Sequence, residues 1–228
     1  MSVKNRTVAG LAGLALAGGA CMVATAGAPA AHAASVKCGT ACSSLFNQKF
    51  GSTDVSAVSG STATGSAVIL AGAAPSAAQD WAVIPDGIVS SFFKAGLINA
   101  TMNKHYASDE LYEYEYVPAR TFTTLCLGVA AVPGNGTKVV LEQCGVSAST
   151  LWIDDAAAAA DSAVSTVSTA LSGEYAPLIS GSDTQYPAPE VLTATAVGGD
   201  FTTTPLSVNA KGVVAPNQMW QTISGVLH

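Results

Sequence analysis

Three tryptophan triplets recur at nearly equal spacing along the chain, and they constrain its fold more than any other feature. They are Gln79-Asp80-Trp81, Thr150-Leu151-Trp152 and Gln218-Met219-Trp220, and they hold every tryptophan of the protein. The tryptophans are 71 and 68 residues apart, and an apolar run precedes each triplet, at Val68–Leu70, Val139–Leu141 and Val191–Leu192. Self-similarity at a fixed period indicates a repeated unit, so the sequence predicts three copies of one β unit around a shared core.

The rest of the pattern is typical of an all-β protein, with short β-branched runs separated by Gly, Pro, Ser and Asn. Residues 111–117 alternate strictly, which places Tyr112, Tyr114 and Tyr116 on one strand face. These rings form either a stacking surface for a sugar chain or partner, or a face buried against the body of the protein. The Ala-rich stretch 154–172 fits a helix or a flexible linker.

Composition excludes two classes of protein. Only 11% of the 228 residues are charged and 49% are hydrophobic, whereas a disordered chain has the opposite balance. The formal charge of −6 argues against nucleic acid as a partner.

The first 33 residues predict a secretory signal peptide that is removed from the mature protein. Lys4 and Arg6 form a positive start, an Ala/Leu/Gly-rich stretch follows, and Ala31-His32-Ala33 is a small-residue cleavage site. A membrane anchor is the alternative, but small residues and Pro29 stand where a charged stop is expected. We therefore expect a secreted, extracellular protein, residues 34–228, with 7 basic and 15 acidic residues and no membrane insertion after cleavage.

Four cysteines remain after cleavage, and an even number in an exported protein indicates disulfides. Three pairings are possible, of which we favour Cys38–Cys42 and Cys126–Cys144. The second closes an 18-residue, hairpin-like segment. A zinc site is disfavoured because no second Cys or His pair has ligand spacing, and the sequence predicts no metal and no cofactor.

The segment from Leu125 to Trp152 carries a specific resemblance. It runs Cys126-Leu-Gly-Val, Asn135-Gly-Thr, Val139-Val-Leu-Glu-Gln-Cys144 and Thr150-Leu-Trp152. This order resembles the repeat of ricin-type β-trefoil lectins, and the whole chain resembles uncharacterised secreted actinobacterial proteins. The resemblance implies a β-trefoil of three pseudo-repeats, with Trp81, Trp152 and Trp220 in the core and the preceding Gln bonded to backbone.

The resemblance also implies where sugar ligands lie. An Asp, an aromatic ring and an Asn are expected, but the middle copy has Gly128, Glu142 and Ser149, and the first copy has Ala71 and Ala78. The last copy keeps Asn217 and Gln218, with Asp183 near the expected Asp and Tyr186 or Phe201 as the ring. Because the intervals exceed the family's repeat length, we expect insertions at about 90–118, including the tyrosine-rich strand, and at 154–172.

No catalytic constellation stands out. There is no G-x-S-x-G elbow, and His105 lies in no recognisable motif. Glu113 and Glu115 share a strand face and suit the two carboxylates of a glycoside hydrolase, although a solvated strand face is the simpler interpretation.

We therefore predict a non-catalytic, carbohydrate-binding protein of the ricin-type lectin-like kind, with a glycan or cell-surface polysaccharide as partner. The alternative is a protein-binding or protease-inhibitor module on a degenerate trefoil, with a protein partner. A small secreted hydrolase is the third hypothesis.

Overall fold

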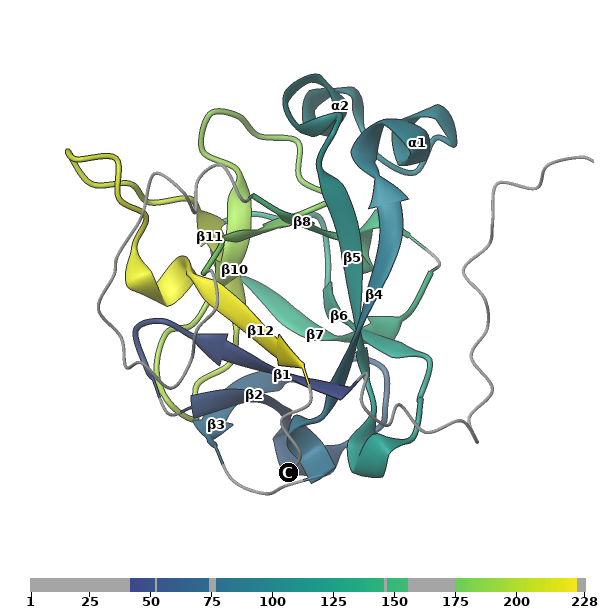
Figure 1. Cartoon of the computed structure of the whole chain (residues 1–228), viewed down its shortest axis with the longest axis vertical. Coiled ribbons are helices and arrows are strands. Elements are labelled where there is room, and N and C mark those ends of the chain that lie inside the picture. Colours follow the sequence, from purple (N-terminus) through teal and green to yellow (C-terminus); the bar gives the residue numbers. More distant parts are fainter. Residues whose placement is uncertain (1–41, 52, 74–76, 146, 156–174, 225–228) are drawn as a thin grey trace, which may run out of the picture.

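The structure, a computed structural model, describes residues 42–51, 53–73, 77–145, 147–155 and 175–224. Strands dominate this part of the chain: β1 (Cys42–Asn47), β2 (Thr53–Ala57), β3 (Val68–Gly72), β4 (Trp81–Ile88), β5 (Glu110–Tyr116), β6 (Leu125–Val129), β7 (Thr137–Gln143), β8 (Trp152–Asp154), β9 (Leu178–Ser180), β10 (Glu190–Thr193), β11 (Thr202–Pro205) and β12 (Trp220–Ser224). Helices α1 (Val89–Lys94) and α2 (Ala100–Tyr106) lie side by side between β4 and β5 in the chain (Figure 1). Neither described helix has the length and apolar character needed to cross a bilayer.

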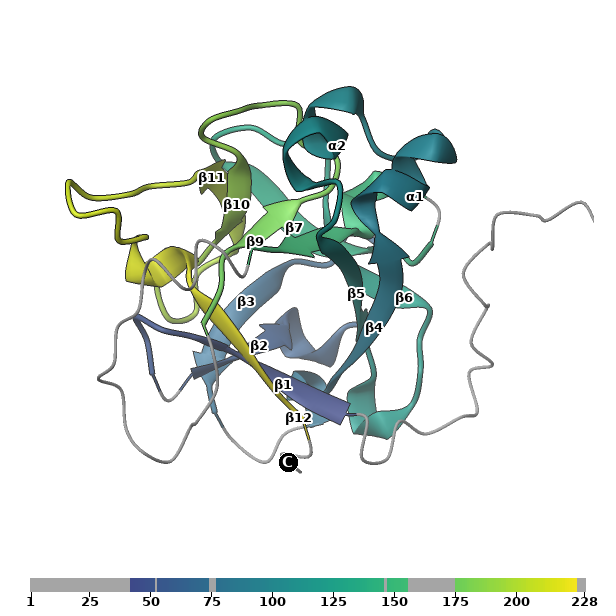
Figure 2. The same ribbon diagram turned by 45° about the horizontal axis from the view of Figure 1, so that its top comes forward.

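Six of the strands form a closed ring. β1 pairs with β4, β4 with β5, β5 with β8, β8 with β9, and β12 with β1. The ring closes where Ala176, just before β9, exchanges two backbone hydrogen bonds of 2.8 Å with Trp220 of β12. Figure 2 shows β12 lying along β1, and β5 along β4.

The other six strands form three hairpins, β2–β3, β6–β7 and β10–β11, one in each copy of the repeat. The hairpins meet one another through β7–β11 pairing and through the bridges Ala67–Val140 and Ile69–Asp200. A six-stranded barrel with three such hairpins is a β-trefoil, as the sequence predicted.

The tryptophans mark the threefold pattern. Each one begins a barrel strand, follows a short 3-10 turn, and is at most 2% exposed. The Nε1 of Trp81, Trp152 and Trp220 donates to the carbonyl of Val55, Leu127 and Leu192, respectively, at 3.0, 2.9 and 2.9 Å. The predicted core role is therefore confirmed, and these three equivalent bonds join each hairpin to the barrel.

The predicted insertions need correction. The first runs from Val89 to Asp109 and contains α1 and α2, whereas the tyrosine-rich strand is β5 of the barrel itself. The apolar pair Val191–Leu192 belongs to β10, and the third counterpart of β3 and β7 is β11, which is too polar to be found by hydrophobicity. Asp154 ends β8; the remainder of 154–172, apart from Asp155, lies outside the described residues, as does the leader 1–33.

Three apolar clusters hold the described chain together, the smallest being Cys42, Ala82 and Val117. The largest fills the trefoil and contains the three tryptophans. The second lies beneath the inserted helices, where Val89, Met102 and Tyr106 pack with Leu111 and Ile153 of the barrel. The inserted segment is therefore packed firmly on the trefoil by buried side chains.

The Cys126–Cys144 disulfide is confirmed, with the two Cα atoms 5.0 Å apart. It joins the start of β6 to the end of β7, and so fixes the open end of that hairpin. Cys38 lies outside the described residues, and the Cys38–Cys42 pairing stays a prediction.

Candidate functional site

The tyrosine face of β5 does not form a ligand surface. Tyr114 and Tyr116 are 2% and 0% exposed and belong to the trefoil core, and Tyr112 packs against that core while its hydroxyl donates to Glu110 at 2.6 Å. The hypothesis that the three rings stack on a sugar chain is therefore wrong for Tyr114 and Tyr116, because the rings face into the barrel.

The opposite face of β5 is buried as well. Glu113 and Glu115 are 2% and 0% exposed, so the expected solvated strand face is wrong. The backbone N–H of Thr124 donates to Glu115 Oε1 at 2.7 Å, and the N–H of Gly145 donates to Glu113 Oε1 at 2.7 Å. Both carboxylates thus lie under the chain that flanks β6 and β7.

Asp183 has a structural role. It is buried, and its carboxylate accepts from the N–H groups of Thr184, Gln185 and Glu190 at 2.6, 3.0 and 2.7 Å. These bonds fix the loop between β9 and β10, so the predicted sugar contact by Asp183 finds no support in its geometry.

Gln218 and Asn217 bond mainly within their own repeat. Gln218 Nε2 donates to the carbonyl of Pro205 at 2.9 Å, and Asn217 Nδ2 donates to the carbonyl of Ala194 at 3.2 Å. Gln79 Nε2 likewise donates to the carbonyl of Gly72 at 2.8 Å. The backbone-bonding role implied for the glutamines is present in both copies that have one.

Tyr186 is the accessible ring among the predicted site residues. It is 51% exposed and stacks on His105 of α2, with ring centroids 3.4 Å apart and planes 6° from parallel. Asn99, which caps α2, also donates to the carbonyl of Asp183. The insertion and the β9–β10 loop therefore form one continuous surface. Phe201, the other ring considered, is fully buried in the core.

The three positions where the resemblance implies sugar ligands can be compared by register. They hold Ser56, Ala71 and Ala78 in the first copy, Gly128, Glu142 and Ser149 in the second, and Thr193, Thr204 and Asn217 in the third. The first two sets border open hollows of about 580 and 450 Å³. None of these described sets combines an acid, a ring and an amide, and in the third the two threonine hydroxyls bond each other at 2.8 Å.

A smaller, deeper cavity lies between the insertion and the barrel. Its volume is about 190 Å³, and it is lined by Pro85, Asp86, Phe92, Leu97, Glu113, Gly145, Ser147 and Leu151. Pro85, Leu97 and Ser147 are exposed and form the mouth, whereas Glu113 and Leu151 are buried and form the floor. An apolar cavity of roughly 150 Å³ can hold one six-membered ring, so this cavity suits a ligand of similar size.

A break in the β4–β5 ladder turns Asp86 toward this cavity. Pro85 pairs with Tyr112 and Gly87 with Leu111, which leaves Asp86 as the extra residue of a β-bulge. Gly87 has a φ of +122°, a conformation that L side chains rarely adopt. Bulges often re-aim a side chain beside a functional site, and this one sets the Asp86 carboxylate near Glu113.

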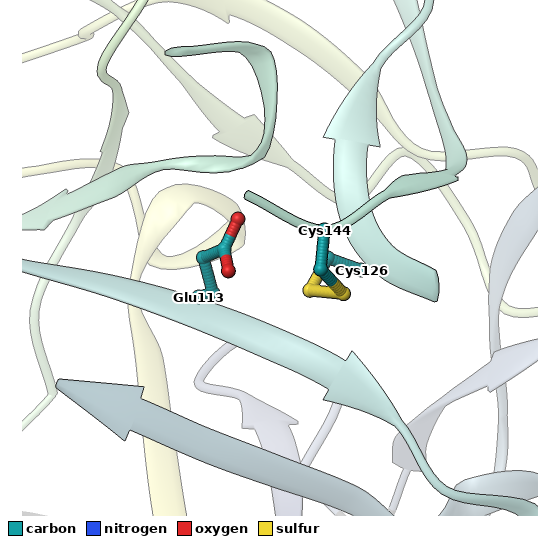
Figure 3. A group of neighbouring side chains, drawn as sticks. All are labelled: Glu113, Cys126 and Cys144. Carbon is teal, nitrogen blue, oxygen red and sulfur yellow. A yellow bond between two sulfur atoms is a disulfide. The ribbon is translucent and has the colours of Figure 1, made fainter. Parts of the chain in front are cut away.

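Glu113 is held in place at the cavity floor. Its Oε1 accepts from the Gly145 N–H and from the Thr150 hydroxyl. Figure 3 shows its carboxylate beside the Cys126–Cys144 disulfide. The two sulfurs are bonded to each other, whereas a cysteine binds a metal ion as the free thiolate. Glu113, Cys126 and Cys144 therefore do not fit a metal site.

The described residues that line the cavity provide no cation for its two carboxyl groups. Burial, and then the neighbouring Glu113 carboxylate, raise the pKa of Asp86 from 3.8 to about 7. Asp86 Oδ2 is buried and accepts no hydrogen bond within the described chain. Among the described residues that line the cavity, none is Lys, Arg or His.

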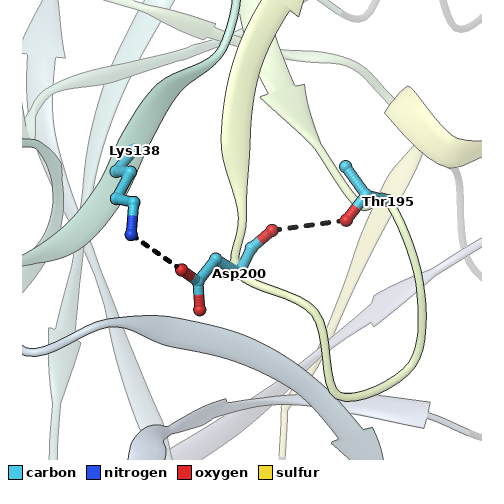
Figure 4. A network of polar contacts seen from close by, with 3 residues as sticks. All are labelled: Lys138, Thr195 and Asp200. Carbon is cyan, nitrogen blue, oxygen red and sulfur yellow. Dashed lines mark hydrogen bonds and ion pairs between the residues drawn. The ribbon is translucent and has the colours of Figure 1, made fainter.

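An acidic side chain elsewhere on the surface shows the contrast. Asp200 accepts from Lys138 Nζ at 3.1 Å, and its backbone carbonyl accepts from Thr195 Oγ1 at 3.5 Å (Figure 4). Its side chain is 42% exposed and is therefore both paired and solvated. Asp86 Oδ2 is instead buried, and none of the described residues that line its cavity is a cation.

Sequence reasoning singled out Glu113 but paired it with Glu115, and it missed Asp86. The only local sign was Pro85-Asp86-Gly87, which is a turn-like pattern within a strand. Asp86 lies near Glu113 only because of the long-range pairing between β4 and β5, in which Ile84 is opposite Glu113.

The sequence matches no protein-family model and no curated protein. In structure the chain is similar to the designed threefold symmetric protein ThreeFoil, with 13% identity, a TM-score of 0.48, and coverage of 80% of this chain and 98% of that one. It is similar to a mosquitocidal holotoxin (14% identity, TM-score 0.48, 79% and 17% covered) and to the agglutinin of Abrus precatorius (16%, 0.44, 80% and 46%). We assign the β-trefoil fold from the chain's own strand pairing and threefold pattern, since these similarities are distant.

Proposed function

We propose that this protein is exported and binds carbohydrate without changing it chemically, and that the sugar enters the cavity beside Asp86. The observation that carries the proposal is the Asp86 carboxylate, whose buried Oδ2 accepts no hydrogen bond from the described chain. Sugar hydroxyls are donors that suit such an acceptor, and Phe92, Leu97 and Pro85 supply apolar walls for the ring.

The cavity is a better candidate than the trefoil hollows. The hollows are more open, and the positions that would hold ligand groups carry small side chains such as Ala71, Ala78 and Gly128. A binding site usually combines apolar walls with a few convergent polar groups, which is the composition of the Asp86 cavity.

Binding is favoured over hydrolysis by the state of Glu113. Hydrolysis needs two accessible carboxylates on either side of the scissile bond. Glu113 is 2% exposed, and its Oε1 already accepts two hydrogen bonds. It therefore suits a fixed acceptor at the floor of a pocket better than a nucleophile or a base.

Binding of the purified protein to a glycan array and to insoluble polysaccharides tests this proposal. We expect binding that falls roughly tenfold or more in Asp86→Ala, since a hydrogen bond to a charged group contributes about 1.5–3 kcal/mol. Asp200→Ala is the matched control, because it removes the same charge from a paired, exposed site.

Two results would contradict the proposal. Binding lost in Tyr186→Ala but retained in Asp86→Ala would place the site on the His105–Tyr186 surface. Absence of glycan binding by folded protein, together with capture of an exported protease, would favour the protein-binding alternative. The mass of the exported product tests cleavage after Ala33 separately.

A further inference from the structure

The Asp86 cavity contains carboxylate oxygens that accept no hydrogen bond from the described chain. Asp86 Oδ2 is buried and accepts nothing from the described chain. Glu113 uses Oε1 for both of its hydrogen bonds, and its Oε2 receives none from the described residues. Asp86 Oδ2 is thus a buried acceptor without a donor from the described chain, which is costly, so a ligand that brings several donors to this point gains from satisfying it.

The described lining of the cavity also contains two carboxyl groups and no cationic side chain. Asp86 and Glu113 are the titratable groups among its described lining residues: β4 supplies Asp86, β5 supplies Glu113, and α1 and the chain before β8 contribute Phe92, Gly145, Ser147 and Leu151. The Glu113 carboxylate disfavours the ionisation of Asp86, and a positive group between the two relieves that repulsion.

The missing donors and the missing cation both indicate the same kind of ligand. We infer that the cavity selects a sugar with a free ammonium group, of the glucosamine type, whose cation lies between Asp86 and Glu113. An ammonium carries three donors and one positive charge, which matches two carboxylates with unused oxygens. The inference rests on the proposed carbohydrate binding and specifies its substrate class.

The walls favour an organic cation over a metal ion. Calcium takes six to eight oxygen ligands, whereas much of this lining is apolar, with Phe92, Leu97 and Leu151 around the two carboxylates. Apolar walls suit the carbon face of a sugar ring, and the Ser147 hydroxyl at the mouth can bond a ring hydroxyl.

Matched oligosaccharides test the inference. Titration calorimetry of the purified protein near pH 7 would compare β-1,4-linked hexamers of glucosamine, N-acetylglucosamine and glucose. We expect the glucosamine hexamer to bind roughly ten- to hundredfold more tightly than the other two, since charge-assisted bonds are about twice as strong as neutral ones. Asp86→Asn should reduce that preference to about threefold or less.

Controls separate charge from shape. Asp200→Asn removes the same charge elsewhere and should leave the preference unchanged. Glu113→Gln keeps an acceptor for Gly145 and should reduce the preference as Asp86→Asn does. Thermal unfolding of each variant verifies that it is folded.

The outcomes distinguish the two claims. Equal binding of all three hexamers, with or without Asp86→Asn, would overturn the ammonium inference and leave carbohydrate binding intact. Binding of no glycan at all would overturn both. A preference for glucosamine that persists in Asp86→Asn and in Glu113→Gln would show that the cation lies elsewhere.

Discussion

Replacement of Asp86 by asparagine should stabilise the protein, increasingly so as the pH rises from about 4 to about 7. The pKa of Asp86 is raised from 3.8 to about 7, first by burial and then by Glu113. Between these values the folded protein retains a proton that the unfolded chain has lost, so the free energy of unfolding falls as the pH rises from about 4 to about 7. An asparagine side chain cannot ionise, so Asp86→Asn removes this penalty.

The size of the effect follows from the two pKa values. At about 1.4 kcal/mol per pH unit, the full difference between 3.8 and about 7 corresponds to roughly 4 kcal/mol. Asp86 is only half-buried, and solvent screens charges that water reaches. We therefore expect Asp86→Asn to raise the free energy of unfolding by about 1–2 kcal/mol near pH 8, and by almost nothing near pH 4.

Urea unfolding at both pH values measures this directly. Asp54, whose pKa burial also raises to about 7, lowers the stability of wild type and variant alike as the pH rises. The difference between the two proteins therefore isolates Asp86. Asp200→Asn should show no stabilisation at either pH, because Asp200 is solvated and paired with Lys138. Destabilisation by Asp86→Asn near pH 8, or an effect equal at both pH values, would refute the reasoning.

Three further variants test the trefoil. The double variant Cys126→Ser/Cys144→Ser opens an 18-residue loop and should lower the free energy of unfolding by about 3 kcal/mol, measured in urea. Trp152→Phe removes the Nε1–H that donates 2.9 Å to a buried carbonyl, and should cost about 1–3 kcal/mol by thermal unfolding; an effect below about 0.5 kcal/mol would contradict the structural role of that bond. Gly128→Ala places a Cβ only 2.9 Å from that of Glu142, and should cost about 1–3 kcal/mol with sugar binding unchanged.

The trefoil was predictable because its repeat is anchored by rare residues. Tryptophan occurs three times, and each occurrence fills the same place and donates to an equivalent carbonyl. Hydrophobicity alone would have missed the third copy, where β11 is a run of threonines and a proline. The even number of cysteines after cleavage, and the 18-residue hairpin-like segment between Cys126 and Cys144, favoured the disulfide that the structure contains.

The strand around Tyr114 shows what an alternating sequence pattern does not determine. A period of two assigns residues to two faces, but it does not say which face meets the core. The tyrosines face the barrel interior, and the carboxylates of the other face are covered by the chain around Thr124 and Gly145. Both faces of β5 are consequently buried, and the sequence pattern alone cannot distinguish this from a strand with one solvated face.

The candidate site was beyond sequence reasoning for a related reason. Asp86 and Glu113 are brought together by the register of β4 and β5 and by a one-residue bulge. No sequence motif predicts the register or the bulge. The α1 residue Phe92 becomes part of the cavity wall only because the insertion packs on the barrel. The acids that do stand near a motif, such as Asp183, are used to hold loops.

The two larger apolar clusters of the described chain separate the stability of the trefoil from the proposed binding site. The tryptophans and their partners lie in one cluster, whereas the cavity walls Phe92 and Leu151 belong to the other, beneath the insertion. Ala71, Ala78 and Gly128 occupy positions where the resemblance implied sugar ligands, and the core is retained because none of them belongs to the core cluster. The proposed ligand site, built from the insertion and one bulge, can therefore change in sequence while the threefold hydrogen bonds of the tryptophans keep the scaffold unchanged.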